Sequence, residues 1–164
     1  MIQELAKVLI EKNLTICSAE SLTGGLFGAN LSEISGISKV YKGSLVTYQD
    51  QAKIEVLRVK ESTIQNFGAL SLECAYEMVK NVQKMFNSDI AVSFTGNAGP
   101  TGSEGKPVGL VYIGVYFLGE VEIIELNLKG TREEIRNECL RVVSNKILRK
   151  ISKKSLPIKK EVAS

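Results

Sequence analysis

The stretch LTICSAESLTGG, residues 14–25, decides the fold of this chain. It begins with a short β-prone run, passes into serine, threonine and glycine, and is followed over residues 26–31 by a segment with helical character. In α/β proteins, a strand that ends in small polar residues and leads into a helix exposes reactive or phosphate-binding groups. We therefore expect a strand–loop–helix unit here, with a candidate site in its loop.

Segments with strand and helix patterns alternate on both sides of this unit. The pattern predicts strands at residues 14–17, 43–48, 90–94, 108–117 and 121–128, and helices at residues 2–12, 26–31 and 51–57, from residue 71 and from residue 131. This alternation favours an α/β fold, a single-domain three-layer α/β/α sandwich with a mixed sheet. We expect one domain over residues 1–150 and a flexible basic tail over residues 151–164.

The composition of the 164-residue chain limits its chemistry. Hydrophobic residues make up 44% and charged residues 24%, which is typical of a globular protein, and the length suits one domain. The chain contains no histidine. This excludes Ser-His-Asp triads, Cys-His dyads and histidine-ligated zinc, so acid–base catalysis has to use lysine, tyrosine or carboxylate side chains.

Charge is unevenly distributed along the chain. Residues 1–148 carry 15 basic and 17 acidic side chains, whereas residues 149–164 carry 6 basic side chains and 1 acidic one. This basic end contains no aromatic residue, which argues against binding of single-stranded nucleic acid. We therefore expect a solvated terminus and no nucleic-acid partner.

Cysteine usage and the apolar runs favour a cytoplasmic protein. Cys17, Cys74 and Cys139 are far apart and odd in number, so we expect buried thiols rather than a disulfide framework or a zinc site. No stretch approaches the ~18 apolar residues that a membrane span needs. Residues 1–13 carry acidic side chains within their apolar run, unlike a signal peptide, so no membrane partner is expected.

Ser21 is the first candidate for chemistry because it lies at the predicted junction of strand and helix. There its hydroxyl would lie beside the free N–H groups of the first helical turn, which Thr23, Gly24 and Gly25 could supply to an oxyanion. The alternative is that Ser21 or Ser18 only caps the helix, since serine is common at that position.

A serine nucleophile needs a base, and in a chain without histidine a lysine is one choice. Lys53 follows the strand that ends at Tyr48 and lies on the predicted short helix. It could act as a base only if burial lowered its pKa from about 10.4 towards neutrality. The spacing does not show whether Lys53 meets Ser21, and a solvated helical lysine is the alternative.

Two further segments could bind an anion. Residues 95–109 form a predicted Gly-rich loop, and such loops hold anions through successive N–H groups, although no Walker-type phosphate loop fits. The residues Gly130-Thr131-Arg132 begin a predicted helix, and Thr131 with Glu134 matches a capping box. The helix dipole and the guanidinium of Arg132 suit a phosphate, while a plain helix cap is the alternative.

Five separated motifs occur in register along residues 1–150: SAESLTGG (18–25), GSLVTY with AK (43–53), GALS (68–71), TGNAGP with KPVG (95–109), and GTREEIR (130–136). Together they resemble the CinA C-terminal domain family, which includes stand-alone nicotinamide mononucleotide (NMN) deamidases, called PncC. Many members carry a further N-terminal domain, and this chain is expected to lack one.

The resemblance implies an amidohydrolase that converts NMN and water into nicotinic acid mononucleotide and ammonia through a Ser–Lys mechanism, with no metal and no cofactor. Matched residue by residue, Ser21 would be the nucleophile and Lys53 the base that later protonates ammonia. Tyr48 would orient Lys53 or the amide. Arg132 would bind the phosphate of NMN, and the other substrate-binding residues would be Thr23, Gly24, Gly25, Thr95, Gly96 and Gly99.

The sequence departs from the family pattern inside the predicted substrate loop. Asn97 stands where a branched apolar residue is usual, and residues 101–106 lack the paired glycines often found there. The main alternative is therefore a catalytically impaired nucleotide-binding module. A nucleic-acid-associated competence factor, suggested by the family's name and the basic tail, is another. Relatives often assemble as homodimers, but nothing in this sequence locates an interface.

Overall fold

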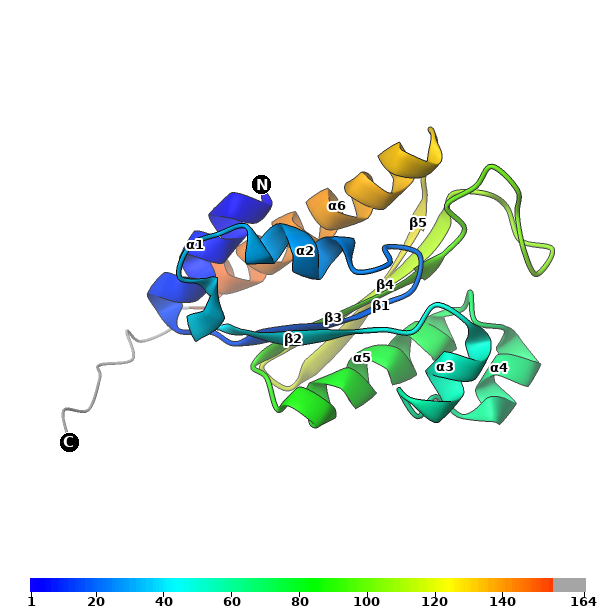
Figure 1. Cartoon of the computed structure of the whole chain (residues 1–164), viewed down its shortest axis with the longest axis horizontal. Coiled ribbons are helices and arrows are strands. Elements are labelled where there is room, and N and C mark those ends of the chain that lie inside the picture. The colour runs from blue at the N-terminus through cyan, green and yellow to red at the C-terminus, as the bar shows by residue number, and fades with distance from the viewer. Residues whose placement is uncertain (155–164) are drawn as a thin grey trace.

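A computed structural model describes residues 1–154, which fold around one five-stranded sheet (Figure 1). The strand order is β2-β1-β3-β4-β5, in which β1 runs parallel to β2 and β3, and β4 runs antiparallel to β3 and β5. The strands are β1 (Ile16–Glu20), β2 (Tyr41–Val46), β3 (Ile90–Gly96), β4 (Leu110–Phe117) and β5 (Glu120–Asn127).

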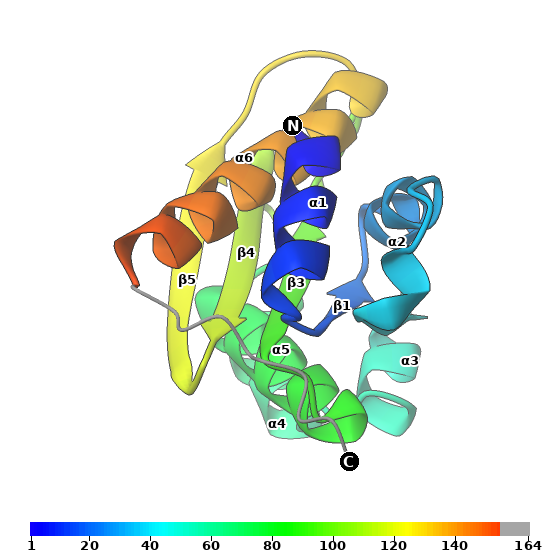
Figure 2. The same cartoon turned by 90° about the vertical axis from the view of Figure 1, so that its left-hand side faces the viewer.

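Helices cover both faces of this sheet (Figures 1 and 2). The helices are α1 (Ile2–Lys12), α2 (Leu26–Ser32), the 3₁₀ helix η1 (Ile37–Lys39), α3 (Asp50–Glu55), α4 (Glu61–Phe67), α5 (Leu72–Phe86) and α6 (Arg132–Lys153). Helices α1, α2 and α6 lie on one face, and α3, α4 and α5 lie on the other. The predicted three-layer α/β/α sandwich with a mixed sheet is confirmed.

The C-terminal helix, the cysteines and the apolar content of the helices can be compared with the sequence predictions. Helix α6 continues through Lys153, and residues 155–164 of the predicted tail lie outside the described residues. The three cysteines are buried free thiols, as predicted. None of the helices within residues 1–154 is long and apolar enough to cross a membrane.

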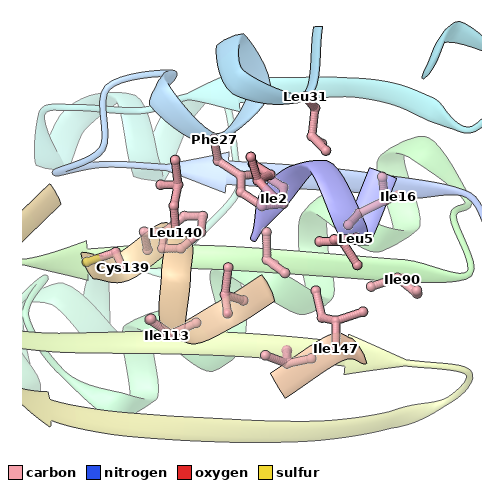
Figure 3. Close-up of a cluster of buried hydrophobic side chains, with 14 of the residues drawn as sticks. Ile2, Leu5, Ile16, Phe27, Leu31, Ile90, Ile113, Cys139, Leu140 and Ile147 are labelled. Carbon is pink, nitrogen blue, oxygen red and sulfur yellow. The ribbon is translucent and has the colours of Figure 1, made fainter. Parts of the chain in front are cut away.

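The larger hydrophobic core fills the space between the sheet and the layer of α1, α2 and α6. Ile2 and Leu5 of α1 and Phe27 of α2 belong to this core, part of which is drawn in Figure 3. The ring of Phe27 packs against that of Phe94 on β3, with centroids 5.5 Å apart. Because helices bury both faces of the sheet, every residue of β1 is buried, as expected for a central parallel strand.

Strand β1 extends three residues beyond its predicted end at Cys17, because its polar side chains find partners inside the protein. The Ser18 hydroxyl donates to the Glu20 carboxylate at 3.0 Å. The same carboxylate accepts the N–H groups of Phe27 at 3.0 Å and Gly28 at 3.1 Å, at the start of α2. Glu20 therefore satisfies the first turn of α2, and neither Ser18 nor Ser21 caps it.

Helix α6 begins where the sequence predicts it. The Thr131 hydroxyl accepts the N–H of Glu134 at 3.1 Å, and the Glu134 carboxylate accepts the N–H of Thr131 at 3.0 Å, which completes a capping box. The start of α6 lies toward the right-hand end of the molecule in Figure 1. Arg132, its first residue, contacts the loop between β3 and β4 through the carbonyl oxygen of Gly99.

Candidate functional site

A cavity of about 380 Å³ opens beside the carboxyl ends of β1 and β3. The chain leaves β1 to form a neighbour on one side, β2, and returns to form β3 on the other side. In open α/β sheets, ligands bind at this kind of switch point. The predicted site residues that line the cavity are Ser21, Tyr48, Lys53, Gly96, Gly99 and Arg132.

Ser21 lines this cavity, directly after β1. Its N–H donates to the carbonyl oxygen of Phe94 at 3.0 Å, which continues the pairing of β1 with β3. On the other side, the N–H of Thr47 donates to the carbonyl oxygen of Glu20, which brings Tyr48 next to Ser21. The Ser21 hydroxyl donates to the carbonyl oxygen of Tyr48 at 3.5 Å, and the side chain is buried.

Lys53 reaches the same carbonyl oxygen from α3. Its amine donates to the Tyr48 carbonyl oxygen at 3.0 Å, and the residue is only 2% exposed. The alternative of a solvated lysine is therefore wrong. Within residues 1–154, no hydrogen bond joins the Ser21 hydroxyl directly to the Lys53 amine. The two groups meet through a shared acceptor.

Burial lowers the pKa of Lys53, because desolvation disfavours its ammonium form. Negative charge on Cys74, Asp50 or Glu104 opposes this change and raises the pKa of Lys53. Burial also raises the pKa of the Cys74 thiol to about 12, so Cys74 is neutral at physiological pH. Asp50 and Glu104 are thus the negative charges that raise the pKa of Lys53. Burial outweighs them and lowers this pKa, which is the direction that a lysine base requires.

Tyr48 and Arg132 together border the cavity further out. The Tyr48 side chain is 56% exposed, and its hydroxyl accepts from Arg132 at 2.7 Å. A second nitrogen of Arg132 donates to the carbonyl oxygen of Gly99, also at 2.7 Å. The part of Tyr48 that contacts Lys53 is therefore its main-chain carbonyl oxygen, while its phenol group contacts Arg132.

Residues 23–25 lie beside Ser21 but do not line this cavity. The N–H of Gly24 donates to the carbonyl oxygen of Ser21 at 2.9 Å, so a turn already uses one of the three donors that were expected to serve an oxyanion. Leu22 does line the cavity, and its N–H has no hydrogen-bond partner among the described residues. Arg136, which sequence reasoning did not select, donates to the carbonyl oxygen of Leu22 at 3.0 Å.

Thr95 and Asn97 organise the loop after β3. Thr95 is buried outside the cavity, where its hydroxyl donates to the carbonyl oxygen of Ala69 at 2.8 Å. Asn97 lines the cavity, and its side chain donates to the carbonyl oxygens of Lys106 and Pro107 at 3.1 and 3.2 Å. The unusual asparagine therefore holds the loop in shape, which an apolar side chain could not do in this way.

A model of the CinA C-terminal domain family matches residues 1–151. The chain belongs to this family. It is 43% identical over 154 residues to a putative competence-damage inducible protein of Bacillus subtilis, covering 94% of this chain and 37% of that protein. It is 46% identical over 133 residues to a CinA-like protein of Dictyoglomus turgidum, covering 80% and 32%. The chain thus spans about a third of the length of these relatives.

Solved structures of CinA-family proteins share the fold. A CinA superfamily protein from Klebsiella pneumoniae superposes with a TM-score of 0.89 at 30% identity, covering 93% of this chain and 96% of that one. The competence/damage inducible protein CihA from Agrobacterium tumefaciens gives 0.84 at 36% identity, covering 90% and 94%. The chain therefore corresponds to nearly the whole of each of these solved chains.

Proposed function

We propose that this domain is an amidohydrolase that deamidates NMN by acyl transfer through Ser21 and Lys53. The observation that carries the proposal is the shared contact of the Ser21 hydroxyl and the buried Lys53 amine with one carbonyl oxygen, at the wall of a cavity of ligand size. Membership of the CinA C-terminal domain family, which includes NMN deamidases, supports the same assignment.

The proposed reaction proceeds as two acyl transfers. Neutral Lys53 takes the proton of the Ser21 hydroxyl, and the oxygen attacks the amide carbon of NMN. The tetrahedral intermediate collapses when the C–N bond breaks, and the Lys53 ammonium donates its proton to the amide nitrogen, which leaves as ammonia. A water molecule then gives its proton to Lys53, attacks the acyl-enzyme and releases nicotinic acid mononucleotide, with the proton returning to Ser21.

Two features of the geometry suit the first step. The contact of the Ser21 hydroxyl with the Tyr48 carbonyl oxygen is long, at 3.5 Å, so a small rotation of the hydroxyl towards Lys53 would cost little. The shorter contact of Lys53, at 3.0 Å, holds the amine in place. The unpaired N–H of Leu22, the residue after the nucleophile, is the donor that we assign to the oxyanion.

Arg132 is the group that we assign to the phosphate of NMN. It lines the cavity at the first residue of α6, where its positive charge and the helix N-terminus both favour an anion. Its guanidinium contacts the phenol oxygen of Tyr48, whereas Ser21 and Lys53 contact the main-chain carbonyl oxygen of the same residue. A substrate with an amide at one end and a phosphate at the other would match this separation.

Ammonia release from NMN tests the proposal. We expect the wild-type protein to release ammonia and to form nicotinic acid mononucleotide, and Ser21→Ala to lower the rate at least about 1000-fold. Ser35→Ala is the matched control, because Ser35 is exposed and does not line the cavity, and it should retain the wild-type rate. No ammonia from the wild type, or equal rates for wild type and Ser21→Ala, would overturn the proposal.

A binding module without turnover is the second candidate function. The lack of a direct hydrogen bond between Ser21 and Lys53 within the described residues favours it, and so does the unusual Asn97. Calorimetry that detects NMN binding, together with a mass-spectrometric assay that finds no product, would select this candidate. Product formation that depends on Ser21 would exclude it.

A further inference from the structure

One wall of the cavity is formed by residues 101–106 of the loop after β3, which we call the strap. Its residues Thr101, Gly102, Ser103 and Glu104 line the cavity. Glu104 attaches the strap to the segment before α5, because its two carboxylate oxygens accept the N–H groups of Ala69 at 2.7 Å and Leu70 at 3.0 Å. A carboxylate that binds two adjacent N–H groups forms strong, charge-assisted hydrogen bonds.

The surroundings of Glu104 fit this attachment closely. Gly68 precedes the two N–H groups, and a Cβ atom at Gly68 would collide with the Glu104 carboxylate. Lys106, at the end of the strap, donates to the carbonyl oxygens of Phe67, at 2.9 Å, and Leu70. The strap and the segment before α5 are therefore joined by side chains of opposite charge that each bind main-chain groups.

The charge of Glu104 also reaches Lys53. The groups whose charge acts on Lys53 come from three elements: Asp50 from α3 itself, Cys74 from α5 and Glu104 from the strap. Cys74 is a neutral thiol at physiological pH, as argued above, so Asp50 and Glu104 are the negative charges that act on the amine. Both carboxylates line the same cavity as Lys53.

We propose that Glu104 is a positioning residue of the candidate site: its carboxylate fixes the strap as a cavity wall and holds a negative charge in the cavity that Lys53 also lines. This inference rests on the proposed function for its consequence in catalysis. In that reaction Lys53 carries a positive charge from the attack of Ser21 until ammonia leaves, and a fixed negative charge nearby stabilises this state. Glu104 thereby acts on the reaction through Lys53.

The test measures the ionisation of Lys53 directly, without requiring turnover. In protein labelled with ¹³C at lysine Cε, the chemical shift of Lys53 is followed against pH, and the amide exchange of Ala69 and Leu70 is measured by NMR. Glu104→Gln removes the charge and one acceptor, and Lys106→Met loosens the strap but leaves the carboxylate. Glu120→Gln, at the exposed first residue of β5, is the matched control.

Glu104→Gln and Lys106→Met should both loosen the strap, but only Glu104→Gln should change the titration of Lys53. In both, amide exchange at Ala69 and Leu70 becomes about tenfold faster or more, because each variant loses hydrogen bonds that hold this segment. The titration of Lys53 moves to lower pH in Glu104→Gln but not in Lys106→Met. An unchanged Lys53 titration in Glu104→Gln, or the same downward movement in Lys106→Met, would overturn the inference.

Activity and folding are separated in the same experiment. Glu104→Asp keeps the charge and shortens the side chain, so the titration of Lys53 should stay close to that of the wild type. This variant tests the inference even if Glu104→Gln does not fold. A shift of the Lys53 titration to lower pH in Glu104→Asp would contradict the inference. In an active enzyme, Glu104→Gln should also move the acidic limb of the kcat/KM profile to lower pH. The expected NMR result without NMN deamidation would refute the proposed function alone.

Discussion

Replacing Lys53 by methionine is expected to lower the activity strongly and at the same time to stabilise the fold. Lys53 is 2% exposed, and within residues 1–154 its amine has one hydrogen-bond acceptor, the carbonyl oxygen of Tyr48. The lowered pKa of Lys53 means that the folded protein holds the ammonium form less readily than the unfolded chain does. A buried lysine with this property destabilises the fold at neutral pH, which function can require.

The size of the stabilisation follows from what methionine keeps and what it removes. Methionine fills a similar volume and buries a similar apolar stem, so the packing changes little. The lost hydrogen bond to Tyr48 costs about 1 kcal/mol, partly offset because Ser21 still donates to that oxygen. Removing the desolvated amine outweighs this cost, and we expect a net gain of about 1–2 kcal/mol, or ~2–8 °C in Tm.

The stability gained in Lys53→Met should depend on pH, in a direction that follows from the lowered pKa of Lys53. Between the folded pKa of Lys53 and its ordinary value of 10.5, the unfolded wild-type chain binds more protons than the folded protein. Wild-type stability from this group therefore rises with pH through that interval. The advantage of Lys53→Met should be largest below the folded pKa and should shrink as the pH approaches about 10.

Urea unfolding and calorimetry at several pH values measure the effect, with ammonia release measured in parallel. Activity is expected to fall by about 100- to 10,000-fold, the usual contribution of a general base. Lys129→Met is the matched control, because Lys129 is exposed, and it should change neither quantity. A Lys53→Met protein that is less stable than the wild type, or a stability difference that does not depend on pH, would refute the reasoning.

Two further predictions concern α6. Arg132→Gln should raise KM for NMN by about tenfold or more with a smaller effect on kcat, because it removes a charge assigned to the phosphate, and an unchanged KM would place the phosphate elsewhere. Thr131→Val should lower stability by about 1 kcal/mol, or ~2–4 °C in Tm by calorimetry, because the capping box loses its hydroxyl; no change would show that water replaces the cap.

The parts of the fold that depend on local sequence were predictable. The capping box of Thr131 and Glu134 sets the start of α6, and both its bonds lie within four residues. Helix α4 was not predicted, because its seven residues bury only Thr63 and so show no apolar stripe. Strand β1 was predicted too short, because Glu20 is buried by contacts with α2 that no local pattern indicates.

The site shows the same division between local and long-range causes. Ser21 could be selected because a strand, small polar residues and a helix follow one another in the sequence. Ser21 and Lys53 share the carbonyl oxygen of Tyr48 as acceptor. This arrangement depends on the parallel pairing of β1 with β2, which aligns Glu20 with Val46 and brings Tyr48 beside Ser21. The role of Glu104 could not be predicted, since its partners lie 34 and 35 residues away along the chain.

The central claim is that Ser21 becomes acylated during turnover, with Lys53 as its base. Rapid quenching of a reaction with NMN, followed by mass spectrometry of the peptide that contains Ser21, tests this claim most directly. We predict a transient adduct on Ser21 with the mass of the nicotinate mononucleotide acyl group, absent in Ser21→Ala and strongly reduced in Lys53→Met. Full-rate deamidation without any adduct on Ser21, or an adduct on another residue, would contradict the account.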